Sequence, residues 1–267
     1  MTFREVKPYL GRGRNHLLSS QVEFIKGVPD RSEFDLMREH PDVFIKTEIL
    51  TDDEMALIPE RRKGFVYAKM PLAEPLNPAD GPYAILPALD KLQLLWKIEE
   101  DENDRWADLL TLHLIGISPF GATHTAKLVK LVQWLARTRS GQYTNTRIHG
   151  DPTLANLVVL HGEWHWVDPL RRNYIPHDPH VDLGKIFQSG CGYEQHIGSN
   201  YSQDLDLNYR FMQYVADHLK LDYYTGLVWM IIHYVRLIRY QKEEQTKKNV
   251  IEFLEKLFAT VVNDVRL

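Results

Sequence analysis

The sequence predicts an α+β protein with a small β-rich N-terminal lobe and a larger α-rich C-terminal lobe. Three observations support this fold class: short alternations of apolar and polar residues up to Met70, a proline-rich segment over residues 71–83, and helical spacing of apolar residues from Ala84 onward. We therefore expect one domain in which residues 1–70 form the first lobe, residues 71–83 the hinge and residues 84–267 the second lobe.

The composition is that of a folded globular protein. The chain has 267 residues, of which 44% are hydrophobic and 25% charged. The net charge of −4 offers no basic excess, so we expect no specific nucleic-acid binding. The single cysteine, Cys191, cannot form an internal disulfide and suits a cytoplasmic location. The most apolar window, 226–238, is too short to span a bilayer, so we expect a core helix and no membrane association. A monomer is the default expectation, and a dimer is left open.

The first lobe should contain short strands and one helix. Residues 22–26 alternate as a half-buried strand does, and glycine and proline follow directly. Ser32 is placed to cap a helix over 33–39, which ends near a proline. The segments 43–50 and 64–70 have the composition of further strands.

The second lobe should be mainly helical, because its apolar residues recur every three or four positions. The helices that we expect cover residues 89–96, 106–114, 123–139, 209–219, 227–241 and 247–262. One segment interrupts this pattern. Residues 156–160 and 164–167 read as two strands joined by a glycine-containing turn, which predicts a β-hairpin.

A polar motif lies just before this hairpin. Residues 147–156 read Arg-Ile-His-Gly-Asp-Pro-Thr-Leu-Ala-Asn and contain the spacing His-x-Asp-x₄-Asn. This spacing is that of the catalytic loop of kinases. Asp151 could accept a hydrogen bond from an attacking hydroxyl, and Asn156 offers a neutral oxygen to Mg²⁺.

The hairpin suggests a second metal ligand. Asn156 comes just before its first strand, and Asp168 comes just after its second. Because paired strands bring such positions side by side, we expect the two residues about 5 Å apart. An amide and a carboxylate there would form a site for a hard cation such as Mg²⁺.

With these residues in view, the sequence resembles a known family. His149-Gly150-Asp151, Asn156, Asp168 and the segment 180–185 resemble the core of aminoglycoside phosphotransferases and related kinase-like small-molecule kinases. The match covers residues 147–189. It implies a two-lobed protein-kinase-like fold, with a nucleotide-binding first lobe and a catalytic, substrate-binding second lobe.

The resemblance also implies roles for individual residues. Asp151 would be the catalytic base, and Asn156 and Asp168 would bind Mg²⁺. His149 would be a structural partner of the catalytic loop. Asp182 would support that loop from the following helix without touching the substrate.

Phosphate-binding residues are expected in the first lobe. Gly11 and Gly13 could form a loop over the phosphates, since the absence of side chains lets backbone N–H groups approach. Lys26 is our candidate for the lysine that pairs with the α- and β-phosphates, and Lys46 is its rival.

Two further positions complete the expected nucleotide site. Glu33 is the expected partner of the phosphate lysine, and Glu39 is the second candidate. Residues 67–72 should form the connection between the lobes. Backbone groups of residues 69–71, including Met70, should face the adenine.

The function that we predict is ATP- and Mg²⁺-dependent transfer of a γ-phosphate to a hydroxyl group of a small molecule. The alternatives are a catalytically inactive nucleotide-binding or interaction module and a protein kinase. Asp168-Pro169-Leu170, in place of Asp-Phe-Gly, argues against a protein-kinase activation switch. Arg171 and Arg172 could contact substrate or lie exposed, and the acidic runs 52–54 and 101–104 could be helix starts or solvated faces.

Other chemistries have less support. His161 lies in the expected turn and His165 in a strand, so they share no helical face for a zinc ion. His177 and His180 come without a third clustered ligand. A serine hydrolase is not expected, because the chain contains no Gly-x-Ser-x-Gly motif.

Overall fold

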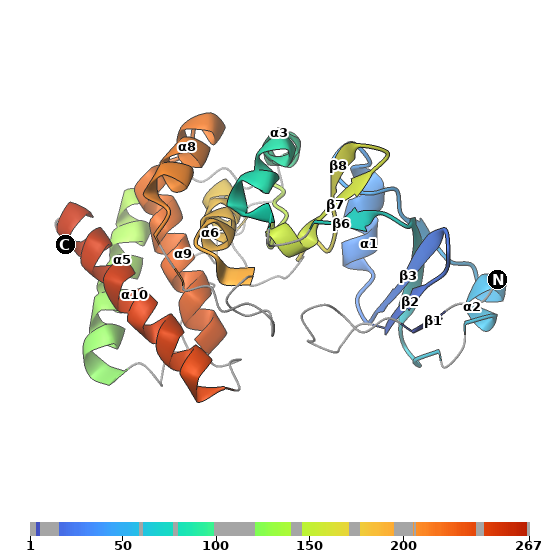
Figure 1. Cartoon of the computed structure of the whole chain (residues 1–267), viewed down its shortest axis with the longest axis horizontal. Coiled ribbons are helices and arrows are strands. Elements are labelled where there is room, and N and C mark those ends of the chain that lie inside the picture. The colour runs from blue at the N-terminus through green and yellow to red at the C-terminus, as the bar shows by residue number, and fades with distance from the viewer. Residues whose placement is uncertain are drawn as a thin grey trace.

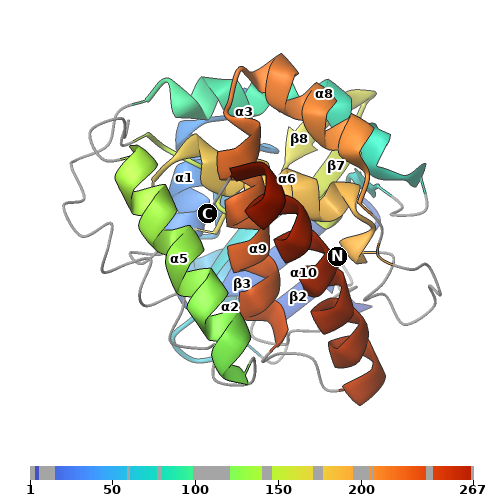
Figure 2. The same ribbon diagram turned by 90° about the vertical axis from the view of Figure 1, so that its left-hand side faces the viewer.

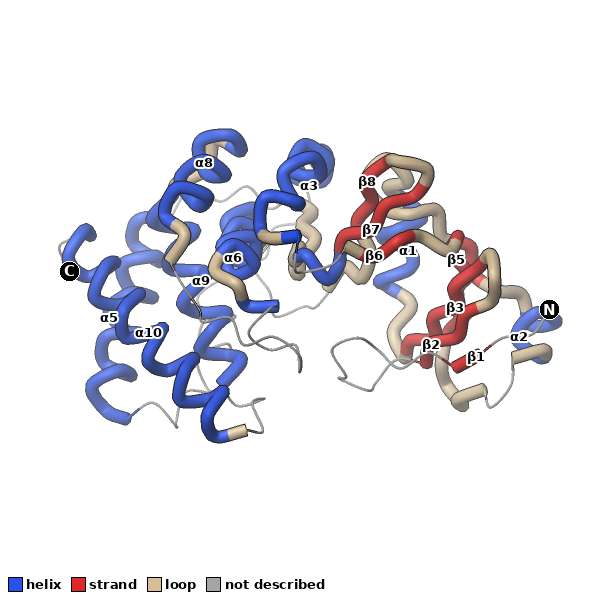
Figure 3. Tube along the Cα trace, in the orientation of Figure 1, coloured by secondary structure: helices blue, strands red, loops and turns tan. Residues whose placement is uncertain are grey.

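The structure is a computed structural model of the whole chain. A sheet-containing part lies at one end of the long axis and a helical part at the other (Figure 1; Figure 3). The structure describes residues 4–5, 16–58, 61–76, 80–98, 121–139, 146–170, 177–194, 205, 207–238 and 243–265.

The N-terminal part is built on an antiparallel sheet. Within the described residues its strand order is β1-β2-β3-β5-β4. The strands are β1 (Arg4–Glu5), β2 (His16–Ser19), β3 (Glu23–Val28), β4 (Glu48–Ile49) and β5 (Val66–Pro71). The strands expected at 22–26 and 64–70 are therefore confirmed as β3 and β5, with ends shifted by one or two residues. In the register of these two strands Gly27 lies opposite Tyr67, whose ring occupies the space that a side chain at Gly27 would need.

The helices of this part differ from the expectation at one cap. α1 (Ser32–Glu39) begins at Ser32, whose N–H donates to Asp30 Oδ1 over 2.9 Å. The expectation that Ser32 caps the helix is wrong, because Ser32 is its first residue and Arg31 holds the N-cap position. Asp30, two residues before Ser32, satisfies the Ser32 donor. α2 (Asp52–Ala56) starts with the acidic run 52–54, and Thr51 and Glu54 form a capping box there.

The segment 43–50 is only partly a strand. Glu48–Ile49 forms β4, whereas Phe44 makes an isolated parallel bridge to Trp166. Ile45 N donates to the Trp166 carbonyl over 3.2 Å, and Trp166 N donates to the Val43 carbonyl over 3.0 Å. This stretch is drawn away from the N-terminal sheet because it pairs with a strand far along the chain.

A second sheet lies between the two parts (Figure 1). It consists of β6 (Glu74–Pro75), β7 (Leu157–Leu160) and β8 (Glu163–Trp166), in that order and antiparallel. The hairpin expected from the sequence is confirmed as β7 and β8. Its two-residue turn places His161 at φ 52° and Gly162 at φ 82°, and positive φ at both positions is the mark of a type I′ turn.

The C-terminal part is helical and contains most of the apolar core. α9 runs through its centre, with α5 and α10 on either side (Figure 2). Every residue of α6 is buried. The helices expected at 89–96, 123–139, 209–219, 227–241 and 247–262 are confirmed, while 106–114 lies outside the described residues. The helical elements that the structure describes in this part are η2 (Pro82–Ala88), α3 (Leu89–Trp96), α5 (Gly121–Arg139), η4 (Leu154–Asn156), α6 (Pro179–Gly190), α8 (Tyr209–Leu219), α9 (Tyr223–Ile238) and α10 (Glu244–Val265).

No helix within the described ranges is long and apolar enough to cross a membrane.

α6 and α9 approach each other closely because each carries a glycine at the contact. A Cβ on Gly184 would lie 2.6 Å from Trp229 Cβ and 2.8 Å from Met230 N. A Cβ on Gly226 would lie 2.6 Å from Leu183 Cδ2. The polar residues of α6 are therefore held in place by a packing surface that admits no extra methyl group.

We expect Gly184→Ala to destabilise the protein by about 1–3 kcal/mol, because overpacking outweighs the gain in helix propensity. Urea unfolding of the variant and the wild type would measure it. Lys248→Ala, at an exposed position of α10, is the control, expected within about 0.5 kcal/mol of wild type. A Gly184→Ala protein as stable as wild type would show that the helices can move apart at no cost.

Candidate active site

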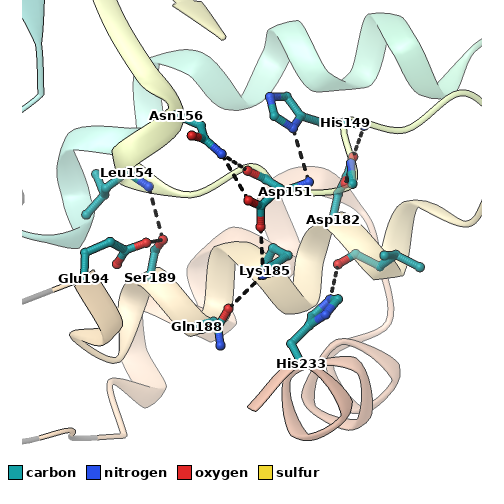
Figure 4. A network of polar contacts seen from close by, with 12 residues as sticks. His149, Asp151, Leu154, Asn156, Asp182, Lys185, Gln188, Ser189, Glu194 and His233 are labelled. Carbon is teal, nitrogen blue, oxygen red and sulfur yellow. Dashed lines mark hydrogen bonds and ion pairs between the residues drawn. The ribbon is translucent and has the colours of Figure 1, made fainter. Parts of the chain in front are cut away.

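The motif Asp is held by contacts on both of its carboxylate oxygens (Figure 4). Lys185 Nζ lies 2.7 Å from Asp151 Oδ1. Asn156 Nδ2 donates to the Asp151 carbonyl over 2.8 Å and to Asp151 Oδ2 over 3.2 Å. Burial raises the pKa of Asp151, but the charge and hydrogen bond of Lys185, together with the charge of Arg236, outweigh it, so the net pKa lies below the usual value. Asp151 is thus presented as an ionised carboxylate in one orientation.

Asp182 of α6 supports the loop that carries His149, Gly150 and Asp151. Its carboxylate accepts hydrogen bonds from His149 N over 2.9 Å, from Gly150 N over 2.7 Å and from Trp96 Nε1 over 3.0 Å. Burial raises the pKa of Asp182 to about 6, and these three donors oppose the rise. The carboxylate faces the loop backbone, as the support role requires.

Gly150 is needed where it stands. Its φ is +80°, and a Cβ there would lie 2.5 Å from the Leu170 carbonyl oxygen. The residue between the motif His and Asp must therefore be glycine, because both the backbone conformation and the space exclude a side chain.

His149 is a buried, neutral side chain. Its Nδ1 accepts a hydrogen bond from Asp151 N over 3.2 Å, and its ring packs between Phe44 and Trp166 at centroid distances of 5.6 and 5.3 Å. Leu170 N donates to the His149 carbonyl over 2.7 Å. Burial lowers the pKa of His149 to about 4. His149 therefore links the loop to the hairpin strand β8 and carries no charge near pH 7.

The N-terminal sheet contributes a lysine to the same region. Lys26 on β3 forms ion pairs with Glu33 of α1 and with Asp168, whose Oδ1 lies 2.8 Å from Lys26 Nζ. Burial disfavours the charge on Lys26, but the Asp168 and Glu33 carboxylates outweigh it and raise its pKa. Burial raises the pKa of Glu33 to about 7, although the charge of Lys26 lowers it.

The rival residues lie elsewhere. The Lys46 side chain is 73% exposed and pairs with Glu48, whereas that of Lys26 is 2% exposed. Glu39 pairs with Arg147 across a distance of 2.5 Å, not with Lys26. The geometry therefore favours Lys26 and Glu33 over Lys46 and Glu39.

The two expected metal ligands are arranged differently from the expectation. The hairpin register places Val167 opposite Asn156, with Val167 N donating to the Asn156 carbonyl over 3.0 Å. Asp168 is the next residue and has a left-handed φ of 57°. The expectation that Asn156 and Asp168 face each other is thus wrong by one position, because the turn has two residues and sets the register.

The donor set still suits a magnesium ion. The Asn156 amide nitrogen is directed at Asp151, which turns its oxygen the other way (Figure 4). The Asp168 side chain is 43% exposed, and Lys26 pairs with only one of its carboxylate oxygens, Oδ1. One amide oxygen and one carboxylate leave room for the water and phosphate ligands that Mg²⁺ retains.

Several residues expected to bind the nucleotide or substrate lie outside the described structure. Gly11, Gly13, Arg171 and Arg172 lie outside the described residues. Because Leu72 N donates to the Val22 carbonyl, the alternation of the ladder directs the backbone of Met70 at Phe24 of β3. The backbone of Met70 is thus directed at β3. The backbone of Lys69 and of Pro71 is directed at the other side of β5.

Three buried polar residues of the site were missed from the sequence: Lys185, Ser189 and Glu194. Ser189 Oγ accepts from Leu154 N over 3.2 Å and donates to Glu194 over 2.5 Å, and burial raises the pKa of Glu194 to about 6. A signal was available, because Asp182, Lys185 and Ser189 are spaced i, i+3, i+7 and share one helix face.

The fold is protein-kinase-like, and several solved structures of kinases match it. A choline/ethanolamine kinase family protein from Mesorhizobium loti matches with a TM-score of 0.60 at 11% identity, over 100% of this chain and 92% of that one. Aminoglycoside phosphotransferase APH(4)-Ia, in a ternary complex with AMP-PNP and hygromycin B, matches with a TM-score of 0.59 at 11% identity, over 98% and 93%. An ethanolamine kinase from Plasmodium vivax matches with a TM-score of 0.57 at 11% identity, over 98% and 84%.

The predicted fold class is therefore confirmed, and the resemblance to these kinases is confirmed at the level of the fold. Neither a protein-family model nor a curated protein matches the sequence.

The buried His149 makes stability depend on pH in a testable way. Its pKa is about 4 in the folded state and about 6.5 when exposed, so between these values the unfolded chain binds the proton and the folded chain does not. The contribution of a neutral His149 is present above pH 6.5 and is lost as the pH falls toward 4.

We expect the free-energy difference between wild type and His149→Asn to shrink by about 2 kcal/mol from pH 7 to pH 5. Asn retains an acceptor oxygen for Asp151 N but does not titrate. Urea titrations of both proteins at pH 7, 6 and 5 would measure the change. A difference that stays constant over this range would mean that the pKa of His149 is the same in the folded and unfolded states.

Proposed function

We propose that this protein is an ATP- and Mg²⁺-dependent phosphotransferase that moves the γ-phosphate to a hydroxyl group of a small molecule. The observation that carries the proposal is the ion pair between Lys26 and Asp168. It joins a lysine of the N-terminal sheet to the acidic residue after the hairpin, beside the loop that holds Asp151. Phosphoryl transfer needs these groups together, because it depends on positioning and on charge stabilisation.

Each residue has a distinct part in this reaction. Asp151 accepts the hydrogen bond of the attacking hydroxyl and takes its proton. Asn156 and Asp168 would hold Mg²⁺, which supplies charge neutralisation for the phosphates when bound. Lys26, oriented by Glu33, pairs with the α- and β-phosphates.

The structural neighbours support this class of reaction. The matching structure of APH(4)-Ia has AMP-PNP and hygromycin B bound together, so its fold accommodates a nucleotide and a small molecule at the same time. The other matching structures described above are choline/ethanolamine and ethanolamine kinases. The combination of this fold with Asp151, Asn156 and Asp168 at one site favours an active enzyme over an inactive nucleotide-binding module.

The role of Asp151 can be tested with Asp151→Asn. We expect transfer to fall by about 10²–10⁴-fold, because the base is lost, while affinity for Mg·ATP changes by less than about threefold. Binding is measured by thermal stabilisation with Mg·ATP. Turnover is measured as phosphate release and as transfer to a panel of hydroxyl compounds.

Two companion variants make this test specific. Asp168→Asn should weaken binding of Mg·ATP, because it removes a proposed metal ligand. Glu163→Gln, on the exposed end of the hairpin, should change neither property. Transfer that survives Asp151→Asn would refute the assigned base. A wild-type chain that neither binds nor hydrolyses Mg·ATP would refute the proposed function.

A further inference from the structure

One face of α6 follows the catalytic loop contact by contact (Figure 4). Asp182 accepts from the backbone of His149 and Gly150. One turn later Lys185 pairs with Asp151, and after a further turn Ser189 accepts from Leu154 N. The helix thus contacts the loop before, at and after the proposed base.

Lys185 is the member of this series that touches the base itself. Its side chain is 4% exposed, and Nζ lies 2.7 Å from Asp151 Oδ1 and 3.2 Å from Gln188 Oε1. Burial lowers the pKa of Lys185, and the Asp151 charge opposes this. Gln188 stands three residues later on the same helix and holds the ammonium from the side away from the loop.

The charges around the pair come from three elements. Asp182 and Glu194 are acidic groups on or just after α6, and Arg236 contributes a positive charge from α9. Glu194 is engaged by Ser189 and Asp182 by the loop backbone, so neither provides the 2.7 Å contact that Asp151 makes with Lys185.

A buried ion pair contributes little to the free energy of folding. Removing a lysine from water costs several kcal/mol, and apolar replacements of such pairs are often neutral or stabilising. The Asp151 side chain remains 33% exposed, so one side of the pair is closed by Lys185 and the other is open. This arrangement suits a carboxylate that must be held still while a substrate approaches from outside.

We propose that Lys185 is a positioning residue for phosphotransfer. Its ammonium holds Asp151 Oδ1 while Asn156 holds Oδ2, so the open side of the carboxylate meets the acceptor hydroxyl in a single orientation. Gln188 sets the position of the ammonium in turn. This inference rests on the function proposed above and assigns to α6 the alignment of the base in addition to the support of the loop.

The experiment compares Lys185→Met, Lys185→Arg and the surface control Lys248→Met. Phosphate release from Mg·ATP, with water as the acceptor, gives kcat and KM. We expect Lys185→Met to lower kcat by roughly 10–100-fold with KM for Mg·ATP within about threefold, because alignment of the base is lost and nucleotide binding is not. Lys185→Arg keeps the charge and should recover part of kcat, and Lys248→Met should match wild type.

A double variant separates positioning from a merely structural role. If Lys185 acts through Asp151, adding Lys185→Met to Asp151→Asn should lower kcat no further than Asp151→Asn alone. Thermal unfolding and Mg·ATP binding report whether each variant is folded. If Lys185→Met does not fold, Gln188→Met replaces it, with a smaller fall in kcat expected at unchanged KM.

Three results would overturn the inference. The first is a folded Lys185→Met protein with wild-type kcat, the second is one in which only KM changes, and the third is a further loss of kcat in the double variant. A Gln188→Met protein with wild-type kcat would do the same where it serves as the replacement. Loss of phosphate release in Asp151→Asn alone, with Lys185→Met fully active, would leave the proposed function standing and reject only the role of Lys185.

Discussion

The carboxylate of Asp182 is the constraint on which the site depends. It is buried beneath the loop and accepts hydrogen bonds from two consecutive backbone N–H groups and from the Trp96 indole. A buried carboxylate of this kind is tolerated only while its donors remain in place. The loop backbone at His149 and Gly150 is therefore tied to α6, and the position of Asp151 follows from it.

The same helix has to be held rigidly for this to work. The glycines at the α6–α9 contact bring the two helices so close that a methyl group would not fit. α9 itself lies in the centre of the helical core. The packing of apolar residues thus determines where the polar face of α6 stands, and that face determines where the base stands.

Among the contacts that the described residues of the N-terminal part make with the site, two involve the hairpin. Lys26 pairs with Asp168 at the end of the hairpin. The stretch around Phe44 bridges to Trp166 of β8 and packs on the ring of His149. Both connections end near the hairpin, which places this small sheet at the junction between the nucleotide-binding and catalytic groups of the proposed enzyme.

The sequence by itself determined the local features of this protein. Helical periodicity, the glycine-containing turn and the spacing of Asp151 and Asn156 depend on neighbours along the chain, so the helices, the hairpin and the motif were predictable. Tertiary structure decided the rest. The segment at 43–50 divided, with Glu48–Ile49 in the N-terminal sheet and Phe44 bridged to Trp166 of the hairpin. Lys185 met Asp151 only because the α6–α9 packing brings that helix face under the loop, and such contacts arise from burial between distant segments that periodicity does not encode.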